Sequence, residues 1–474
     1  MNGFVATALL SLSLFLGSVH ASEPTVIRFD PQSSSLMIST PSRAMPQGNH
    51  EIPDFLAITA QTQDRVTLTG KLPEISGPDS RFGVGEGGAF LFSAIDWLDP
   101  AAWVGGYLRL ESPSAYPGVA TGKRVSELDA NGQYIAEYRI NSDEDLSQLH
   151  VFFGPYLINT EILELNDQSI ELRTYFKPQN QPDSSAYLRA VATYLAEYSN
   201  RIGPYPFDRF AVVSAPLPVG LGLDRMTYVS EQILGHSYMF GRSLAHEVLH
   251  SWWGSGVKVN YQQGNWAEGL TTFMADYALA QQESDAKAME MRRAWLEALN
   301  RVDSYEPLGR FRYAPRRADQ SVGYGKSAMF FHMLHQRLGD EAFYTGIRQF
   351  WNSSRGASAG WSEIEHALAK SSGVDLSADF EFWLAAQRLP SYSVEIAEQM
   401  QASNGYRVVL SIHAEHAPQT GRLPIKFLSS ESTETRWVQL NGEWSEVDLI
   451  FANKIDTVVL DPHFEVLRRL DTKQ

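Results

Sequence analysis

The 474-residue sequence contains no cysteine. This absence excludes a disulfide framework, thiol catalysis, a cysteine-ligated metal and a lipid-modified cysteine. Basic residues are also scarce, with 39 Lys and Arg against 55 Asp and Glu and a net charge of −16. We therefore expect neither nucleic acid nor an anionic membrane surface as a partner. Long hydrophobic runs are lacking beyond the N-terminus, so we expect no integral membrane segment after signal removal.

The first 21 residues have the pattern of a secretory signal. Residues 4–16 form a short apolar core, and Ser18-Val19-His20-Ala21 supplies small residues before Ser22. The usual Lys or Arg ahead of the core is absent. The alternative, an uncleaved anchor, is disfavoured because the apolar run is too short to span a bilayer comfortably. We expect a soluble exported protein, periplasmic or secreted.

The segment from Ser243 to Gly254 contains the pattern His-Glu-x-x-His. His246 and His250 lie one turn apart on the same face of a helix, so their imidazoles can hold one zinc ion. Glu247 lies beside the metal without needing to bind it and can take a proton from zinc-bound water. Glu268, on the next helical stretch, can supply a third ligand and leave a fourth position open for water. The pattern predicts a zinc hydrolase with one Zn²⁺ per chain.

Chance gives roughly 0.02 matches to this pattern in a chain with 12 His among 474 residues. The alternative is a partly buried helix that carries two His for other reasons. The neighbours Val248, Leu249, Trp252 and Trp253 make the segment apolar enough to be buried. Buried charge needs a partner or a metal, so a zinc site is the better explanation.

The apolar pattern divides the remaining chain into three parts. Residues 22–180 alternate short apolar and polar runs, which predicts an N-terminal all-β domain. Residues 181–388 combine helical periodicity with one buried strand and predict a mixed α/β catalytic domain with a helical zinc site. Residues 389–474 return to strands and predict a small β-sandwich-like module, so the expected fold class is α+β multidomain. The expected strands are 67–69, 89–92, 134–140, 170–176, 210–215, 406–412 and 457–460, and the expected helices are 185–200, 237–254, 266–282, 285–301, 324–338 and 361–371.

With these motifs, the chain resembles the zinc aminopeptidases of the alanyl aminopeptidase (aminopeptidase N) type over most of residues 60–390. Gly203-Pro204-Tyr205-Pro206-Phe207-Asp208 is similar to the segment that opens the catalytic domain's strand in that family. Tyr324-Gly325-Lys326-Ser327 resembles the family's Tyr-x-Lys-Gly, which implies that the Tyr324 hydroxyl helps to bind the oxyanion of the transition state. The resemblance implies a thermolysin-like catalytic domain that acts on peptides.

Three features differ from the family's pattern. The 17 residues between His250 and Glu268 are one fewer than usual. The family's Gly-x-Met-Glu-Asn, whose Glu binds the substrate's free α-amine, is lacking, because Gly220–Tyr228 contains no Glu. Asp224 or Glu231 could replace it, and aminopeptidase and broader oligopeptidase specificities both stay open. Large members also have a C-terminal helical superdomain, so we expect a shortened member with a more open cleft.

The expected function is hydrolysis of peptide bonds by zinc-bound water that Glu247 deprotonates, with Tyr324 and zinc stabilising the oxyanion. One alternative is a non-catalytic zinc-binding scaffold that inherited the fold, which would need neither Glu247 nor Tyr324. Another is a hydrolase of non-peptide substrates on the same zinc core. A purely structural zinc site is disfavoured, because such sites favour four protein ligands and usually contain Cys.

Three further polar residues have simpler interpretations. Asp276 follows Glu268 by eight residues and could orient a metal ligand, but a solvated helix face is the simpler prediction. His332 and His335 lie in an apolar helical segment, which favours packing over a second metal pair.

Overall fold

A computed structural model describes residues 23–470 apart from 46–51, 78–79, 87, 96, 100–105, 141–148, 217–219, 237 and 313–320. The signal expected for residues 1–21 lies outside the described residues. Contacts group the chain into two compact units, Met1–Pro155 and Tyr156–Gln474. Among the described helices, none combines the length and the apolar character that a transmembrane span requires.

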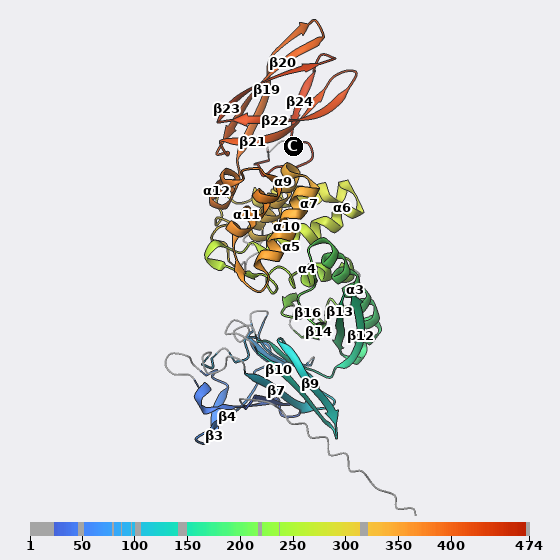
Figure 1. Cartoon of the computed structure of the whole chain (residues 1–474), viewed down its shortest axis with the longest axis vertical. Helices are drawn as coiled ribbons and strands as arrows, with labels where there is room; N and C mark the ends of the chain where they lie inside the picture. The colour runs from blue at the N-terminus through green and yellow to red at the C-terminus, as the bar shows by residue number, and fades with distance from the viewer. Residues whose placement is uncertain are drawn as a thin grey trace, which may run out of the picture. The chain divides into compact units, whose positions relative to one another are not determined.

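The first unit is built from β-sheets (Figure 1). Alternation decides which face of each strand is buried: in β1, Ile27 and Phe29 are buried while Arg28 and Asp30 are exposed. A seven-stranded sheet has the order β3-β4-β2-β1-β7-β10-β9, and a four-stranded sheet the order β5-β6-β11-β8. The strands are β1 Thr25–Asp30, β2 Ser35–Pro41, β3 Leu56–Gln61, β4 Arg65–Lys71, β5 Phe82–Gly85, β6 Gly88–Leu91, β7 Tyr107–Pro113, β8 Gly118–Ala120, β9 Lys123–Ala130, β10 Gln133–Arg139 and β11 Val151–Phe153, with the short helix η1 at Ser42–Ala44.

The second unit begins with a five-stranded sheet of order β12-β13-β14-β16-β15. Its strands are β12 Leu157–Leu165, β13 Gln168–Phe176, β14 Arg209–Ala215, β15 Gly220–Leu223 and β16 Met226–Ser230. The division between the units therefore falls earlier than the boundary expected near residue 180. The reason is that β13 pairs in parallel with β14, so both strands before η2 belong to the sheet of the second unit. The edge strand β15 pairs with β16 only, among the described strands.

Helices make up most of the middle of the second unit (Figure 1). They are η2 Pro178–Asp183, α3 Ser184–Arg201, η3 Met239–Ser243, α4 Leu244–Leu249, η4 Tyr261–Gln263, α5 Ala267–Thr271, η5 Thr272–Tyr277, α6 Ala278–Glu283, α7 Asp285–Leu299, η6 Ser321–Lys326, α9 Ser327–Leu338, α10 Asp340–Ser354, α11 Trp361–Ser372 and α12 Ser377–Ala385, with the short strands β17 Lys258–Val259 and β18 Ser358–Ala359. Three of them, η3, η5 and η6, are π-helical turns. Their core contains Trp252, Trp253, Trp266 and Trp351, all fully buried and in ring contact with one another.

The C-terminal part consists of two three-stranded sheets, β19-β20-β23 and β22-β21-β24. The strands are β19 Ser391–Ala402, β20 Gly405–Glu415, β21 Thr420–Leu428, β22 Thr433–Asn441, β23 Trp444–Phe451 and β24 Thr457–Leu460. Glu465 ties this part to the helices, because its carboxylate lies 2.8 Å from Arg292 of α7 and 2.7 Å from His332 of α9. His332 is thus a buried packing residue, as expected, and the α+β multidomain fold class is confirmed.

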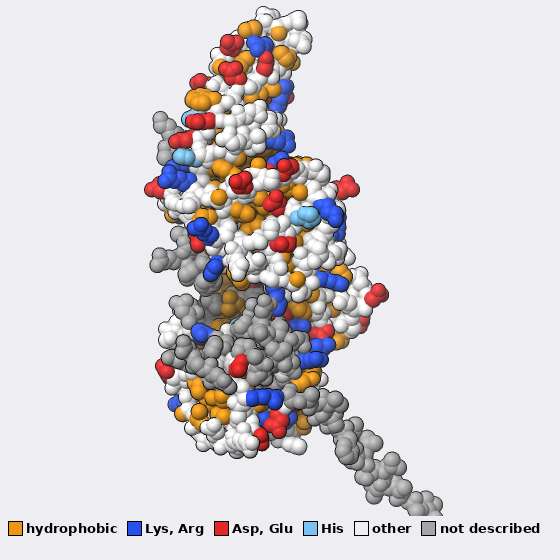
Figure 2. Space-filling model, turned by 60° about the vertical axis from the view of Figure 1, so that its left-hand side comes forward, with side chains coloured by type: hydrophobic (Ala, Val, Ile, Leu, Met, Phe, Trp, Pro, Cys, Tyr) orange, Lys and Arg blue, Asp and Glu red, His pale blue; other side chains and the backbone are white. Residues whose placement is uncertain are grey.

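Charges on the described surface are mixed in sign. On the face that Figure 2 draws, acidic and basic side chains are interspersed.

Candidate metal centre

Helix α4 carries His246, and its C-cap residue is His250; the apolar residues of the helix decide which way these two candidate ligands point. Leu244, Ala245, Val248 and Leu249 are buried in the core, which leaves His246, Glu247 and His250 on the other side of the helix. Tyr198 of α3 donates a hydrogen bond to the carbonyl of Ala245 at 3.2 Å. The core and this bond fix the rotation of α4 about its axis.

The segment Gly203–Asp208 holds the chain immediately after α4. Trp252 donates its indole N–H to the carbonyl of Gly203 at 3.0 Å, and its ring lies 5.5 Å from that of Tyr205. The Tyr205 hydroxyl in turn donates to the carbonyl of Arg209, the first residue of β14, at 2.8 Å. This segment therefore locks the metal helix to the start of a central strand, which is the physical role behind the motif seen in the sequence.

His246, His250 and Glu268 bring their ligand atoms together. Glu268 Oε2 lies 3.5 Å from Nε2 of His246 and 3.5 Å from Nε2 of His250, and the three ligand atoms all lie within 4.8 Å of one another. Glu268 Oε2 is buried and has no hydrogen-bond partner. A buried carboxylate oxygen without a hydrogen bond is costly, and a cation between the three atoms would satisfy it. Two imidazoles and one carboxylate also match the preference of a catalytic zinc ion.

The other ring nitrogens of both histidines are occupied by protein partners. His246 Nδ1 donates to Asp276 Oδ2 at 2.6 Å, and His250 Nδ1 donates to the carbonyl of Trp253 at 2.9 Å. These bonds fix each ring so that Nε2, the nitrogen that faces Glu268, carries the free lone pair. Arg242 lies 3.6 Å from the second oxygen of Asp276 and helps to hold it.

The solvated position predicted for Asp276 is therefore wrong: its carboxylate is hydrogen-bonded to a candidate ligand, as the alternative interpretation requires. In a regular α-helix, eight residues of separation put two side chains about 80° apart around the axis. The π-helical turn η5 follows α5, and its wider turns rotate less per residue. Asp276 thereby returns to the side of the helix that carries Glu268. Sequence periodicity does not reveal a π turn, which is why this contact was missed.

Electrostatics separate the roles of the two glutamates. Burial raises the pKa of Glu247, although the nearby His246 and His250 oppose that shift. Burial also opposes ionisation of Glu268, but His250 and His246 outweigh it and hold the pKa of Glu268 well below its usual range. Glu268 is thus suited to stay ionised as a ligand, whereas Glu247 is suited to accept and hold a proton.

The edge strand β15 passes directly over these residues. A Cβ built on Gly222 would lie 2.9 Å from Cβ of His250 and 3.0 Å from Oε2 of Glu247. A Cβ on Gly220 would lie 3.7 Å from Oε1 of Glu247, which is an ordinary contact. Gly222 is therefore required for the close approach of this strand to the metal centre, and no larger residue fits there without displacement.

The two acids considered as replacements for the amine-binding Glu both have cationic partners. Asp224 lies in the turn between β15 and β16 and forms an ion pair with Arg225. Glu231 forms an ion pair with Lys177 at 2.7 Å. Each carboxylate is therefore already neutralised by a side chain of the protein.

Tyr324 lies beside the candidate ligands, on the π-helical turn η6. Its ring stacks next to that of His246, with centroids 6.1 Å apart and planes inclined by 19°. Lys326, two residues on, is fully buried; its ammonium donates to the carbonyl of Ala386 at 2.6 Å and lies 4.7 Å from the ring centroid of Tyr305. Burial lowers the pKa of Lys326 to about 7. Lys326 thus anchors the turn that presents Tyr324, which explains why the two residue types occur together.

Residues 239–383 match the sequence profile described as the Peptidase family M1 domain. This stretch is therefore similar to the M1 peptidase domain. It contains the three candidate ligands together with Glu247 and Tyr324.

Curated relatives of the M1 domain are aminopeptidases at low identity. Aminopeptidase 2, mitochondrial, of Saccharomyces cerevisiae is 24% identical over 294 residues, which cover 57% of this chain and 31% of that protein. Aminopeptidase N of Lactococcus lactis subsp. lactis is 24% identical over 165 residues, which cover 33% of this chain and 19% of that protein. The matched part therefore spans about a third or less of the length of these two relatives.

The fold is similar to that of a solved structure, Legionella pneumophila aminopeptidase A in complex with aspartic acid. The TM-score is 0.69 at 13% identity, and the match covers 94% of this chain and 59% of that chain. The likeness therefore extends beyond the M1 domain to most of this chain, and it concerns the fold.

Proposed function

We propose that this chain is a zinc-dependent metallopeptidase that hydrolyses peptide bonds. The observation that carries the proposal is the convergence of His246, His250 and Glu268 around a carboxylate oxygen without a hydrogen bond. Glu247 lies beside this group without being part of it, as a general base must. A scaffold that only binds metal would need neither Glu247 nor Tyr324 in these positions.

His246, His250 and Glu268 would hold the zinc ion, which when bound supplies Lewis-acid polarisation of a carbonyl and of water. Glu247 accepts the proton of the attacking water, which its raised pKa favours, and later delivers the proton to the leaving amine. The Tyr324 hydroxyl donates a hydrogen bond to the oxyanion as it develops. The bond that breaks is the amide C–N bond, and the water oxygen ends in the new carboxylate.

A separate question is whether the site requires a substrate with a free N-terminus. The similarity to aminopeptidases supports the removal of single N-terminal residues as the reaction of this chain. Against this, Asp224 and Glu231 are paired with Arg225 and Lys177, and Gly222 offers no side chain beside the metal centre. These observations favour a site that reads the amine weakly and also accepts peptides with internal cleavage sites.

A matched pair of peptide libraries tests both the hydrolysis of peptide bonds and the requirement for a free N-terminus. One library has free N-termini, the other acetylated N-termini, and Glu247→Gln serves as the inactive reference. We expect trimming of the free library together with internal cuts in both, read by mass spectrometry. One-residue trimming confined to free N-termini would support strict aminopeptidase specificity, and products no different from those of the Glu247→Gln reference would overturn the peptidase proposal.

We also propose that the protein is exported to the periplasm or beyond the cell, on the basis of the signal-like pattern of residues 1–21. Expression of the full sequence in a bacterial host tests this. We expect activity in the periplasmic fraction and a mature N-terminus at Ser22. Full-length protein retained in the cytoplasm would contradict export.

A further inference from the structure

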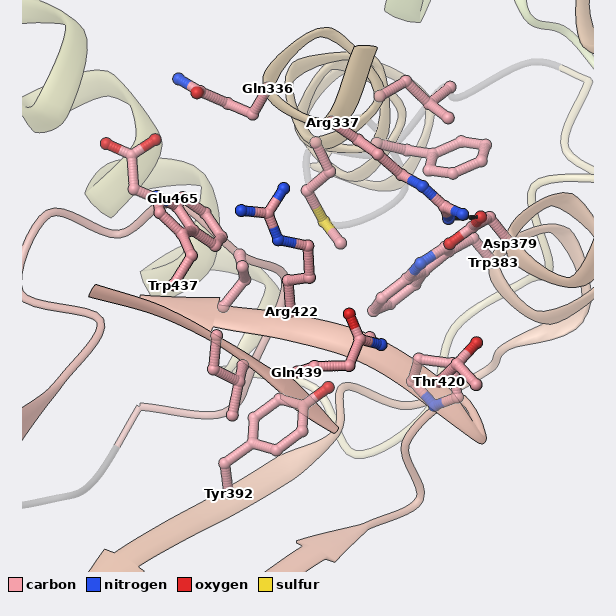
Figure 3. Close-up of a pocket in the computed structure, with 17 residues that line it drawn as sticks. Gln336, Arg337, Asp379, Trp383, Tyr392, Thr420, Arg422, Trp437, Gln439 and Glu465 are labelled. Atoms are coloured by element: carbon pink, nitrogen blue, oxygen red, sulfur yellow. Dashed lines mark hydrogen bonds and ion pairs between the residues drawn. The ribbon is translucent and has the colours of Figure 1, made fainter. Parts of the chain in front are cut away.

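A cavity separate from the metal centre lies where the helices meet the C-terminal strands (Figure 3). It has a volume of about 150 Å³ and lies between α9 and α12 on one side and β21 and β22 on the other. Its walls are largely apolar and include Phe330, Leu334, Trp383, Leu423 and Val466. No candidate metal ligand lines it. A cavity of this size accommodates about one benzene-sized group.

Not all of the charged side chains that line the cavity have an ion-pair partner. Arg337 is paired with Asp379, and Glu465 is held by Arg292 and His332. Arg422 remains: within the described part of the chain, it is the one charged side chain of the cavity without an ion-pair partner. Figure 3 shows its guanidinium rising from β21 into the space below the helix that carries Arg337. The cavity therefore offers one uncompensated positive charge.

Arg422 is exposed to solvent and contacts one neighbouring ring. Its guanidinium carbon lies 5.4 Å from the ring centroid of Trp437, a cation–π distance that restrains the side chain. Thr420 adds a hydroxyl at the same edge of β21, and Tyr392 points a phenol toward the cavity. Burial raises the pKa of Tyr392, so that its hydroxyl stays protonated and able to donate a hydrogen bond at neutral pH.

This arrangement favours an anionic ligand over a cationic one. A cationic ligand would meet only acids that are already paired, whereas an anion would meet Arg422. A planar carboxylate matches the forked donors of a guanidinium, and an apolar group attached to it would fill the walls beside Trp383. We propose that the cavity binds an apolar monocarboxylate, either a free small acid or the C-terminal residue of a peptide, with the carboxylate on Arg422 and the apolar group among Phe330, Trp383 and Leu423. The proposal does not depend on the activity of the metal centre.

Titration calorimetry of the full-length, zinc-loaded protein with 3-phenylpropionate tests the charge requirement. We expect saturable binding that falls at least about tenfold in Arg422→Gln, as expected for loss of a charge-assisted hydrogen bond. Lys426→Gln, which removes one positive charge from the same strand but not from the cavity, should bind like the wild type. Any carboxylate bound at the metal centre persists in Arg422→Gln and is thereby separated from the cavity.

Two further ligands complete the design. 3-Phenylpropionamide keeps the shape but lacks the charge, and we expect it to bind at least about tenfold more weakly than the acid. N-acetyl-Ala-Phe, titrated into Glu247→Gln protein to prevent hydrolysis, distinguishes the sources: its binding would support a peptide C-terminus, and its failure beside binding of 3-phenylpropionate would support a free acid. Equal affinity of acid and amide, unchanged binding in Arg422→Gln, or no saturable binding to the wild type would overturn the proposal.

Discussion

Glu268 and Glu247 are both partly buried carboxylates of the same site, yet their surroundings assign them opposite chemistry. Glu268 faces two imidazoles, which favour its ionised form, and its unpaired oxygen points to the place where a cation would lie. Glu247 is dominated by burial, which favours the protonated form. The two roles follow from the positions of the residues. Glu247 comes one residue after His246, so its side chain lies beside the metal site and is not one of the three candidate ligands.

The substitution Glu247→Gln separates binding of zinc from catalysis. We expect turnover to fall by about 10³-fold or more, because the amide cannot accept the proton of water, while zinc content stays near one ion per chain. Metal analysis and peptide hydrolysis are measured on the same preparation. Glu290→Gln, an exposed glutamate paired with Lys287, is the control and should leave both unchanged. Loss of zinc in Glu247→Gln would contradict the assignment of Glu247 as a base.

Tyr324→Phe removes one hydroxyl and keeps the ring that stacks beside His246. We expect kcat to fall about 10²- to 10³-fold with little change in KM, the signature of a donor that acts in the transition state. Steady-state kinetics on a single peptide measure the two constants. An equal rise in KM with unchanged kcat would instead assign the hydroxyl to substrate binding.

At the scale of secondary-structure elements, periodicity predicted what depends on regular geometry. Strand β24 at Thr457–Leu460 and helix α11 at Trp361–Ser372 agree with prediction to within a residue. The helix expected at 266–282 is present but is interrupted by η5, and α10 and α12 were not anticipated. Spacing on one helical segment was sufficient to place His246, Glu247 and His250 together, and the structure brings Glu268 of α5 to the two histidines. Asp276 depends on a π turn and Gly222 on contact between distant elements, and spacing encodes neither.

Strand β15 offers a matched pair of substitutions. Gly222→Ala places a Cβ 2.9 Å from His250 and 3.0 Å from Glu247, so the strand or the site must shift; we expect at least about tenfold loss of activity. Gly220→Ala adds the same methyl group at an ordinary contact distance of 3.7 Å from Glu247 and should keep most of the activity. Initial rates and circular dichroism on both variants test this. Equal activity of the two variants would show that the close approach at Gly222 is not needed.

The π turn η5 leads to a prediction about metal affinity. Asp276→Asn weakens the hydrogen bond that orients His246, and we expect zinc affinity to fall about 10- to 100-fold with the fold retained. Competition with a chromogenic chelator measures the affinity. Glu283→Gln, at the exposed end of α6, is the control. An unchanged zinc affinity in Asp276→Asn would mean that the core alone orients His246.

At the scale of the whole molecule, the chain separates into two units with different chemistry. The second unit holds the metal centre and ties its C-terminal sheets to the helices through Glu465, Arg292 and His332. The first unit carries no candidate metal group among its described residues, and its core is built from sheet faces. Because such units can unfold separately, a single unfolding transition is not expected, and stability is best followed unit by unit.

We expect a lower pH to reduce the stability of the first unit, because His150 becomes protonated. Burial, with a contribution from Arg81, lowers the pKa of His150 to about 4, and its Nδ1 accepts a hydrogen bond from the backbone N–H of Ser93 at 3.0 Å. The folded pKa lies below the unfolded value of about 6.5, so the unfolded state binds more protons between these values and stability falls as the pH drops from 6.5 to 4. The shift corresponds to at most about 3 kcal/mol.

Hydrogen exchange of β8 and β11, corrected for intrinsic rates, should lose protection over this range in the wild type. His150→Asn, which keeps an acceptor near the position of Nδ1 but does not titrate, should lose less, and the same loss in both proteins would exclude His150 as the acid-sensitive group.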